Sequence, residues 1–366
     1  MKKNSYIEIN TFLPDCFKLN VDYIRVGFTK KQYIEQNDLS TIDIFQYLDI
    51  EDLTLIKNKE KYFVFDYCQE GIFQKSHKLF ECIHYNCNLY KIDKKQVLYF
   101  TSNFKEQAEF DIYPHIYHPW IDWMQNNYID KECDDAFQFT VDMAIKNFKQ
   151  DIYFSSFNKT CDRPWRDYFH YLLYKNKLIH SGFVSNHNRL DRLFGGLDVS
   201  GKHAERFKKI LPLKFDYDYF YGAGKGFHSD VLAFTSPQFH IVTESISDLK
   251  TSCFISEKSF KPIAFFQPFF VIGPEYFHRD VLSKIKIKKY YQLDKFNLDD
   301  RSEIYLQARN TVPKLRRMID HLSNIDRIEW RFKDESTLKH NWKVLRNFAD
   351  NEKMFKEVNT SLSKRL

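Results

Sequence analysis

The segment 254–274 (FISEKSFKPIAFFQPFFVIGP) contains the residues best suited to bind a phosphorylated ligand. Ser256, Glu257 and Lys258 begin a predicted helix over 257–266, and a helix start offers free N–H groups and the positive end of the helix dipole. Lys258 adds a charge for a diphosphate, and the Glu257 carboxylate can accept hydrogen bonds from two hydroxyl groups of a ribose or another sugar. The same residues also suit an ordinary helix start with Ser256 as its N-cap.

The elements that must position these residues alternate between strands and helices. Strands are predicted at 23–27, 61–66, 96–101, 111–117, 151–157, 182–185, 239–242, 269–273 and 290–293. Helices are predicted at 30–37, 72–85, 164–175, 257–266 and, with charged faces, from 302 to the end. This alternation favours parallel sheets with helices on both faces, whose ligands bind at the carboxyl ends of the strands.

The predicted fold class is α/β, with two Rossmann-like domains that face a central cleft and a helical C-terminal tail. The first domain is predicted over 1–150 and the second over 151–330, and the tail, 331–366, is expected to pack back toward the first domain. A length of 366 residues suits two domains of ordinary size. One large α/β domain is the alternative.

Composition and charge indicate the cellular compartment and the kind of partner to expect. Seven scattered cysteines without a CxxC pair favour reduced thiols. No apolar run of membrane-spanning length and no signal-peptide pattern occur, so we expect a cytoplasmic protein (of the host cell if the gene is viral) without a membrane span. The net charge of +6 and the pI of about 8.7 permit a polyanionic partner without requiring one.

The segment 255–274 resembles the donor-binding motif of fucosyltransferase-like and related glycosyltransferases with two Rossmann-like domains, the GT-B type. The resemblance implies that Glu257 contacts the donor ribose and that Lys258 contacts the diphosphate of a nucleotide sugar. Ser256 stands where the family usually has threonine, and Lys261-Pro262 lies within the helix start. The motif covers about twenty residues, and a weaker resemblance extends over 151–275.

Three further patterns in the second half are similar to the same family. The stretch 155–166 (SSFNKTCDRPWR) resembles the start of the donor domain in related phage and bacterial transferases, which implies that Asn158, Arg163 and Arg166 line the donor site. A surface loop with two solvated arginines is the alternative. An arginine there would neutralise the leaving diphosphate.

The other two patterns flank the predicted strand 239–242. The turn 221–226 (YGAGKG) resembles a family turn near the donor, and Gly222 and Gly224 would let the backbone approach the nucleotide closely. The sequence FHIVTE resembles the strand before the donor motif, and its Glu244 would help to hold the sugar or the nucleotide. A plain tight turn and an acid at a strand end are the corresponding alternatives.

A general base is expected from the first domain if the transfer inverts the anomeric carbon. Asp66 and Glu70, in the sequence FDYCQEG after a predicted strand, are the candidates. One acid at a strand end is also expected by chance among 49. A retaining enzyme needs no such base.

Neither a metal nor a cofactor is expected, and the nucleotide sugar is a co-substrate. The string Asp216-Tyr217-Asp218 has the form of a metal-binding D-x-D motif, but it lies in an aromatic run outside the expected context. In the two-domain type, lysine, arginine and a helix dipole can replace the cation.

Two acceptors and one non-catalytic role fit these patterns. The favoured acceptor is hydroxymethylcytosine in phage DNA, in a glucosyl- or arabinosyltransferase-like reaction, because the chain is mildly basic and has basic stretches at 314–317 and 364–365. A cell-surface glycan or lipid-linked precursor is the alternative acceptor. A nucleotide-binding protein without catalysis is the alternative from another class.

Overall fold

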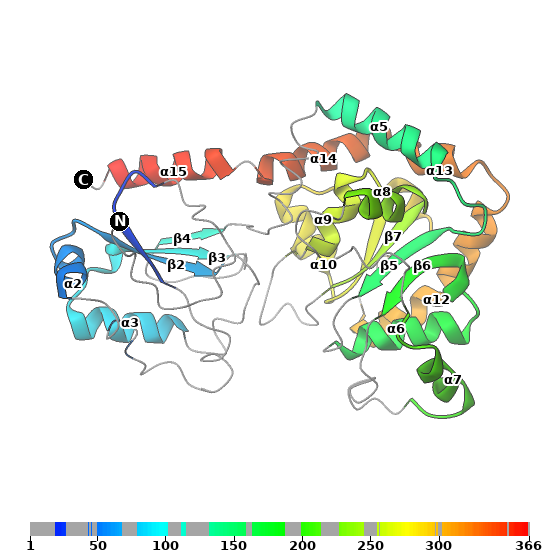
Figure 1. Ribbon diagram of the computed structural model, residues 1–366, viewed down its shortest axis with the longest axis horizontal. Helices are drawn as coiled ribbons and strands as arrows, with labels where there is room; N and C mark the ends of the chain where they lie inside the picture. The colour runs from blue at the N-terminus through cyan, green and yellow to red at the C-terminus, as the bar shows by residue number, and fades with distance from the viewer. Residues whose placement is uncertain are drawn as a thin grey trace. The chain divides into compact units, whose positions relative to one another are not determined.

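The computed structural model describes residues 19–26, 43, 45, 50–67, 79–101, 111–114, 132–158, 163–186, 199–213, 227–244, 255, 257–296, 298, 302–349 and 351–364. Within these ranges the chain forms two four-stranded parallel sheets flanked by helices, which confirms the predicted α/β class (Figure 1). The predicted helix over 30–37 lies outside the described residues.

The first sheet contains β1 (Tyr23–Val26), β2 (Tyr62–Tyr67), β3 (Val97–Thr101) and β4 (Asp111–Pro114), in this spatial order. Because each strand is added on the same side of the preceding one, right-handed crossovers place their helices on one face of the sheet. That face packs on α2 (Ile50–Lys57) and α3 (Leu79–Tyr90) through alternate strand residues such as Phe63 and Phe65.

The opposite face of this sheet is covered by a segment from the far end of the chain. Tyr62, Val64, Leu98 and Phe100 point to this face and pack on α15 (Asn351–Ser363). Phe355, Val358 and Leu362 are the buried residues that α15 contributes, at the i, i+3, i+7 spacing of one helix face. The apolar strand residues on this second face therefore become core only when the C-terminal helix joins the N-terminal sheet.

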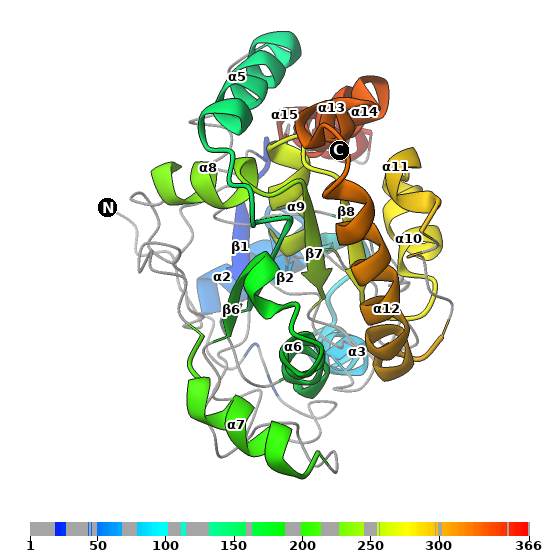
Figure 2. The same ribbon diagram turned by 90° about the vertical axis from the view of Figure 1, so that its right-hand side faces the viewer.

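The second sheet has the strand order β6 (Gly182–Asn186), β5 (Phe154–Asn158), β7 (Phe239–Thr243), β8 (Phe269–Ile272). Its crossovers run in both directions from β5, so right-handed connections place helices on both faces. Helix α6 (Pro164–Lys175) lies on one face with α12 (Ile304–Leu322), and α8 (Phe227–Thr235) and α9 (Glu257–Ala264) lie on the other (Figures 1 and 2).

Further helices complete the layers of the second sheet. They are α5 (Cys133–Lys146), α7 (Lys202–Ile210), α10 (Phe277–Asp280), α11 (Tyr291–Asp294), α13 (Arg327–Phe332) and α14 (Glu335–Ala349). At the amino edge of the sheet, the fully buried Arg331 donates hydrogen bonds to the carbonyls of Thr235, Pro237 and Phe265. One guanidinium thus satisfies three backbone acceptors that loops would otherwise leave unpaired.

The chain separates into two compact units. Unit 1 consists of 1–119, 250–254 and 348–366, and unit 2 consists of 120–249 and 255–347. The sequence places the first boundary near 150; α5 accounts for the difference, because Phe137 packs edge-on against Phe266 and Phe332 of unit 2. The predicted tail 331–366 is divided, since α14 belongs to unit 2 and α15 to unit 1.

The predicted strand over 290–293 is wrong. Tyr291–Asp294 forms the single helical turn α11. Just before it, the Asn341 side chain on α14 donates to the carbonyl of Lys288 and accepts from its N–H, at 2.9 and 2.7 Å. The backbone there is therefore satisfied by a helix side chain rather than by a neighbouring strand.

Candidate functional site

The carboxyl edge of the second sheet contains a topological switch point between β5 and β7. From β5 the chain first crosses to β6 on one side and then returns to β7 on the other. The helices that follow the two strands, α6 after β5 and α9 after β7, lie on opposite faces of the sheet, and α/β proteins bind ligands at such switch points. The described strands of the first sheet follow one another in sequence and contain no such reversal.

The first turn of α6 is hydrogen-bonded to the end of β7 at this switch point. Trp165 Nε1 donates to the carbonyl of Glu244 at 3.2 Å, and Arg166 Nε donates to the carbonyl of Thr243 at 3.1 Å. Proline at the first position of α6, Pro164, suits a helix start that lacks an internal hydrogen bond there. Two successive side chains thus hold the helix start against two successive strand carbonyls.

Asn158, the last residue of β5, belongs to a buried hydrogen-bond network. Its Oδ1 accepts from Thr243 Oγ1 at 2.6 Å, and its Nδ2 lies 3.2 Å from His170 Nε2. Ser156 Oγ lies 3.1 Å from the same histidine nitrogen. An amide N–H donating to Nε2 requires the proton of the neutral imidazole to be on Nδ1.

Burial, and after it the positive charge of Arg166, lowers the pKa of His170 to about 3. The imidazole is therefore neutral at physiological pH and acts as an acceptor for the side chain of Asn158. This arrangement fixes the amide orientation of Asn158 and, through it, the hydroxyl of Thr243. The end of β5 and the end of β7 are joined by side chains as well as by the sheet.

Glu244 joins the end of β7 to α9. Its carboxylate Oε1 accepts a 2.7 Å hydrogen bond from Ser259 Oγ, and its side chain is fully buried. Gly273, after β8, passes so close that a Cβ atom there would lie 3.3 Å from Glu244 Cβ and 3.1 Å from Val271 Cγ1. The Gly273 N–H in turn donates to Gln307 Oε1 on α12 at 3.2 Å.

Five of the residues predicted to contact a donor lie at the carboxyl edge of the second sheet or at the starts of α6 and α9. Asn158, Arg166 and Glu244 meet at the carboxyl edge, and all three are buried. Arg163 is half-buried at the N-cap position of α6, and Lys258 is half-buried in the first turn of α9, next to Ser259. Buried charges are stable only when hydrogen-bonded or paired, and Arg166 and Glu244 both have such partners.

The remaining predicted residues are described only in part or not at all. Glu257 is the first residue of α9 and Asp66 lies in β2, but the side chains of both lie outside the described part of the chain. Glu70, Gly222 and Gly224 lie outside the described residues altogether. Asp66 belongs to unit 1 and the Asn158 network to unit 2.

Sequence reasoning missed the residues that support this edge. Trp165, His170, Thr243 and Ser259 make the connecting hydrogen bonds, and Ser156 contributes to one of them. A usable signal existed, because small polar residues interrupt otherwise apolar strands at positions that must be buried. Buried polar groups require partners, so such interruptions indicate a network.

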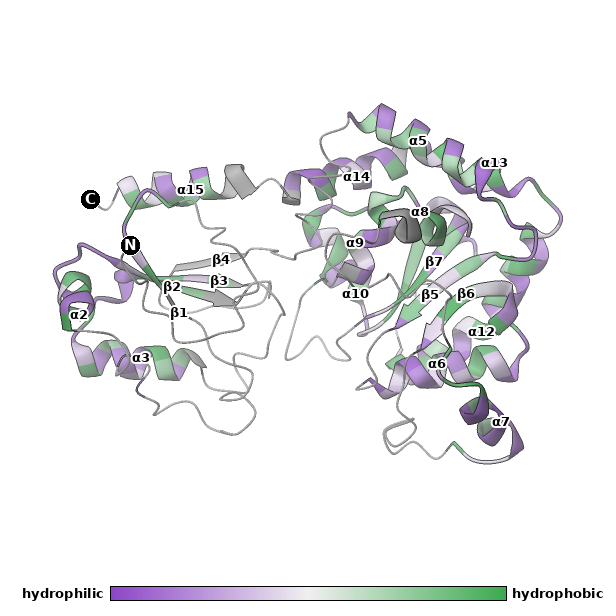
Figure 3. Cartoon of the chain, viewed as in Figure 1, coloured by the Kyte–Doolittle hydropathy of each residue, from purple (hydrophilic) through white to green (hydrophobic). Residues whose placement is uncertain are grey.

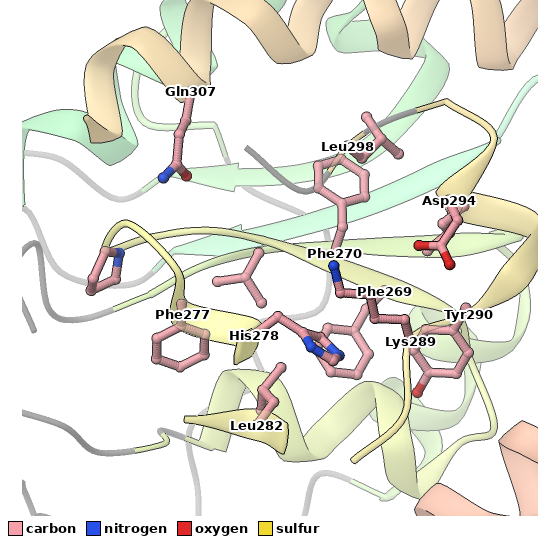
Figure 4. Close-up of a pocket in the computed structure, with 13 residues that line it drawn as sticks. Phe269, Phe270, Phe277, His278, Leu282, Lys289, Tyr290, Asp294, Leu298 and Gln307 are labelled. Carbon is pink, nitrogen blue, oxygen red and sulfur yellow. The ribbon is translucent and has the colours of Figure 1, made fainter. Parts of the chain in front are cut away.

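Beside the edge strand β8 lies a small cavity of about 50 Å³. Its lining includes the aromatic rings of Phe269, Phe270 and Tyr290 together with Lys289 and Asp294 (Figure 4). A space of this size accommodates a few water molecules rather than a nucleotide sugar. The cavity is thus a packing gap beside the candidate site.

Within the described ranges, no group of three or more histidine, cysteine, aspartate or glutamate side chains is arranged to hold a metal ion. In the same ranges, no helix is both long enough and apolar enough to span a bilayer.

No protein-family model, curated protein or solved structure matches this chain.

Proposed function

We propose that the protein is a nucleotide-sugar-dependent glycosyltransferase of the GT-B type, with the donor at the carboxyl edge of the second sheet. The observation that supports this most is the position of Asn158, Arg166 and Glu244 at the switch point, together with the start of α9. These residues come from separate sequence patterns, and each pattern resembles the donor site of the same family. The helix starts of α6 and α9 add N–H donors for phosphate oxygens.

In the proposed reaction, the acceptor oxygen forms a bond to the anomeric carbon while the bond from that carbon to the diphosphate oxygen breaks. Negative charge then grows on the leaving diphosphate. Lys258, Arg163 and the buried Arg166 provide the positive charge that stabilises it, and such preorganised charges act on the transition state. Glu257 is proposed to hold the ribose hydroxyls, and the Gly222–Gly224 turn to border the nucleotide.

Asp66 or Glu70 is proposed to remove the acceptor proton if configuration is inverted. Glu244 differs from the expectation of a direct ligand contact, because its carboxylate binds Ser259 and is fully buried. We therefore propose that Glu244 acts on the donor through α9, by fixing the helix turn that presents Lys258.

The acceptor we propose is the hydroxymethyl group of hydroxymethylcytosine in DNA. The positive net charge and the basic stretch that includes Arg316 and Arg317 support a polyanionic acceptor. A transfer assay with radiolabelled donor compares duplexes that differ only in hydroxymethylcytosine or cytosine. If the sugar is transferred to a lipid-linked precursor but not to the modified duplex, the acceptor is the lipid-linked precursor and not DNA.

The donor proposal is tested by thermal unfolding in the presence of nucleotides and nucleotide sugars. A ligand at 100 times its Kd stabilises the protein by about 2.7 kcal/mol. Lys258→Ala should abolish most of this stabilisation and of turnover while leaving the unliganded melting temperature nearly unchanged. Lys261→Ala is the matched control, because it removes the same charge from the next turn of α9.

The outcomes separate four possibilities. Loss of ligand stabilisation only in Lys258→Ala supports the donor site. Full activity of Lys258→Ala would remove this residue from the mechanism, and the absence of any nucleotide effect on the wild type would refute the proposed function. Nucleotide binding without transfer to any acceptor would identify a non-catalytic nucleotide-binding protein.

A further inference from the structure

One face of unit 2 concentrates the positive charge of the protein. Helices α6, α7 and α12 together contain ten lysines and arginines but three acids, whereas the whole chain has a net charge of +6. The three helices are neighbours, since α12 packs on α6 and the Phe207 ring of α7 packs on Tyr171 and Tyr174 of α6. Figure 3 shows α7 as a mainly hydrophilic helix on this side of the sheet.

Most of these cations are exposed and have no acidic partner in the described part of the chain. We define the basic face by the exposed residues Lys175, Lys177, Lys202, Arg206, Lys209, Arg309, Arg316 and Arg317. Within α7, Lys208 forms an ion pair with Glu205. Arg309 and Arg316 donate to neutral acceptors, Tyr168 Oη and the carbonyl of Asn176, so their charges are not neutralised.

The cations are spread along the helices rather than gathered around one point. On α7, Lys202, Arg206 and Lys209 have the i, i+4, i+7 spacing of one helix face, and Arg309 and Arg316 are seven residues apart on α12. Seven residues of helix extend about 10 Å. A single small anion cannot contact such a row, whereas a polymer with regularly repeated phosphates can.

The distribution of apolar residues favours nucleic acid over a lipid surface. A helix that binds membranes has exposed large apolar residues opposite or beside its cations. On α7 the apolar residues Ala204 and Phe207 are buried against α6, and Ile210 at its end is 39% exposed. The outward side of α7 therefore has several charges, and Ile210 at its end is its one exposed apolar residue.

We propose that the basic face of α6, α7 and α12 binds the phosphate backbone of double-stranded DNA without reading its sequence. This inference rests on the proposed function for the identity of the acceptor, and it adds the surface by which the acceptor is held. Contacts of lysine and arginine to phosphates position the duplex, while recognition of the modified base belongs to the transfer site.

The experiment measures binding of a fluorescent 20-base-pair unmodified duplex by polarisation from 50 to 300 mM salt, without any donor. The triple variant Lys202→Gln/Arg206→Gln/Lys209→Gln should bind roughly tenfold more weakly or worse at the lowest salt. Its slope of log K against log salt should be smaller by about 2.7, which corresponds to about 0.9 for each lost phosphate contact.

The matched control is Lys146→Gln/Lys333→Gln/Lys343→Gln. These three exposed lysines lie in α5, directly after α13, and in α14, and these helices are on the other side of the sheet (Figure 1). The net charge of the control equals that of the test variant, so its salt slope should stay close to the wild-type value. Circular dichroism and nucleotide-dependent melting should be unchanged in both variants, because the substituted side chains are exposed and outside the donor site.

Equal weakening in the two variants would show an effect of net charge alone and would overturn the proposal. Absence of wild-type binding at 50 mM salt would overturn it too, even if nucleotide sugars still raise the melting temperature. Binding to vesicles with anionic lipids in place of DNA would assign the face to a membrane surface instead. A protein that binds DNA through this face but shows no nucleotide effect would retain this inference and lose the glycosyltransferase proposal.

Discussion

Thr243 Oγ1 donates a 2.6 Å hydrogen bond to Asn158 Oδ1, across 85 residues of sequence and between the carboxyl ends of two neighbouring strands. Both side chains are buried, at 1% and 2% exposure. The bond lies at the point where the sheet reverses its order, so it joins the ends of the two strands at a position where α/β proteins bind ligands.

Thr243→Val removes this bond while it keeps the shape of the side chain. The buried Oδ1 of Asn158 then loses its donor, so we expect a loss of about 1–3 kcal/mol in the free energy of unfolding. Nucleotide-dependent stabilisation should also decrease. Thr140→Val is the control, because it removes a buried hydroxyl that donates to Ala136 within α5; urea denaturation and nucleotide titration of both variants test the difference. Equal effects on nucleotide binding would contradict a specific role for Thr243.

The bond between Ser259 and Glu244 is tested by a double-mutant cycle. Ser259→Ala and Glu244→Gln should each destabilise the protein, and their coupling free energy should be roughly 1–3 kcal/mol because the two side chains are in contact. Ser259→Ala should also weaken donor binding, since the next residue, Lys258, is presented by the same turn. A coupling near zero, measured by urea denaturation, would show that the bond does not hold α9.

Gly273→Ala tests the close approach of the strand ends. The added methyl would lie 3.1 Å from Val271 Cγ1 and 3.3 Å from Glu244 Cβ, so these neighbouring side chains must move slightly to accommodate it. We expect a loss of about 1–3 kcal/mol in stability, as for other overpacked sites, and a weaker response to nucleotides. A variant as stable as the wild type in thermal unfolding would show that the end of β8 can move without cost.

Stability should fall between pH 7 and pH 5 because two buried histidines stay neutral in the folded protein. Burial is the main cause that lowers the pKa of His170 and of His240 from 6.5 to about 3, with the charges of Arg166 and Lys261 adding to it. A folded pKa below the unfolded one means that the unfolded chain binds more protons between these values. The stabilisation is therefore complete above pH 6.5 and is lost as the pH falls toward 3.

Each of the two histidines should lower the free energy of unfolding of the protein by about 2 kcal/mol between pH 7 and pH 5. Urea denaturation at the two pH values measures this change. Asp93 and Asp134, whose pKa values are lowered from 3.8, lose their contribution only below about pH 4, outside this interval. His170→Asn should reduce the pH dependence by about half. An unchanged dependence in that variant would mean that His170 is not the titrating group.

Phe355→Ala should destabilise unit 1 by about 3–5 kcal/mol, because the ring is 2% exposed and packs 6.3 Å from the ring of Phe100. Lys356→Ala is the neighbouring control and should change stability by less than about 0.5 kcal/mol, since Lys356 is exposed. Similar denaturation curves for the two variants would mean that α15 is not part of the core of the N-terminal sheet.

The sequence by itself determined the strands of both sheets and the bounds of α6. Apolar runs predicted all eight described strands, and α6 begins at Pro164 and ends at Lys175 as its pattern indicates. Strand and helix periodicity depend on which nearby side chains are apolar, so they can be read from a short window. Asn158 and Glu244 were predicted from short segments that resemble the donor site of a glycosyltransferase family.

The tertiary structure alone decided which strands are neighbours and what the polar residues contact. Nothing within a short window places β5 between β6 and β7, or brings α15 to the first sheet. Glu244 was expected at a ligand, yet it is buried against Ser259, because burial and pairing depend on segments that meet only after folding. Long-range contacts of this kind create the switch point, the anchored start of α9 and the basic face.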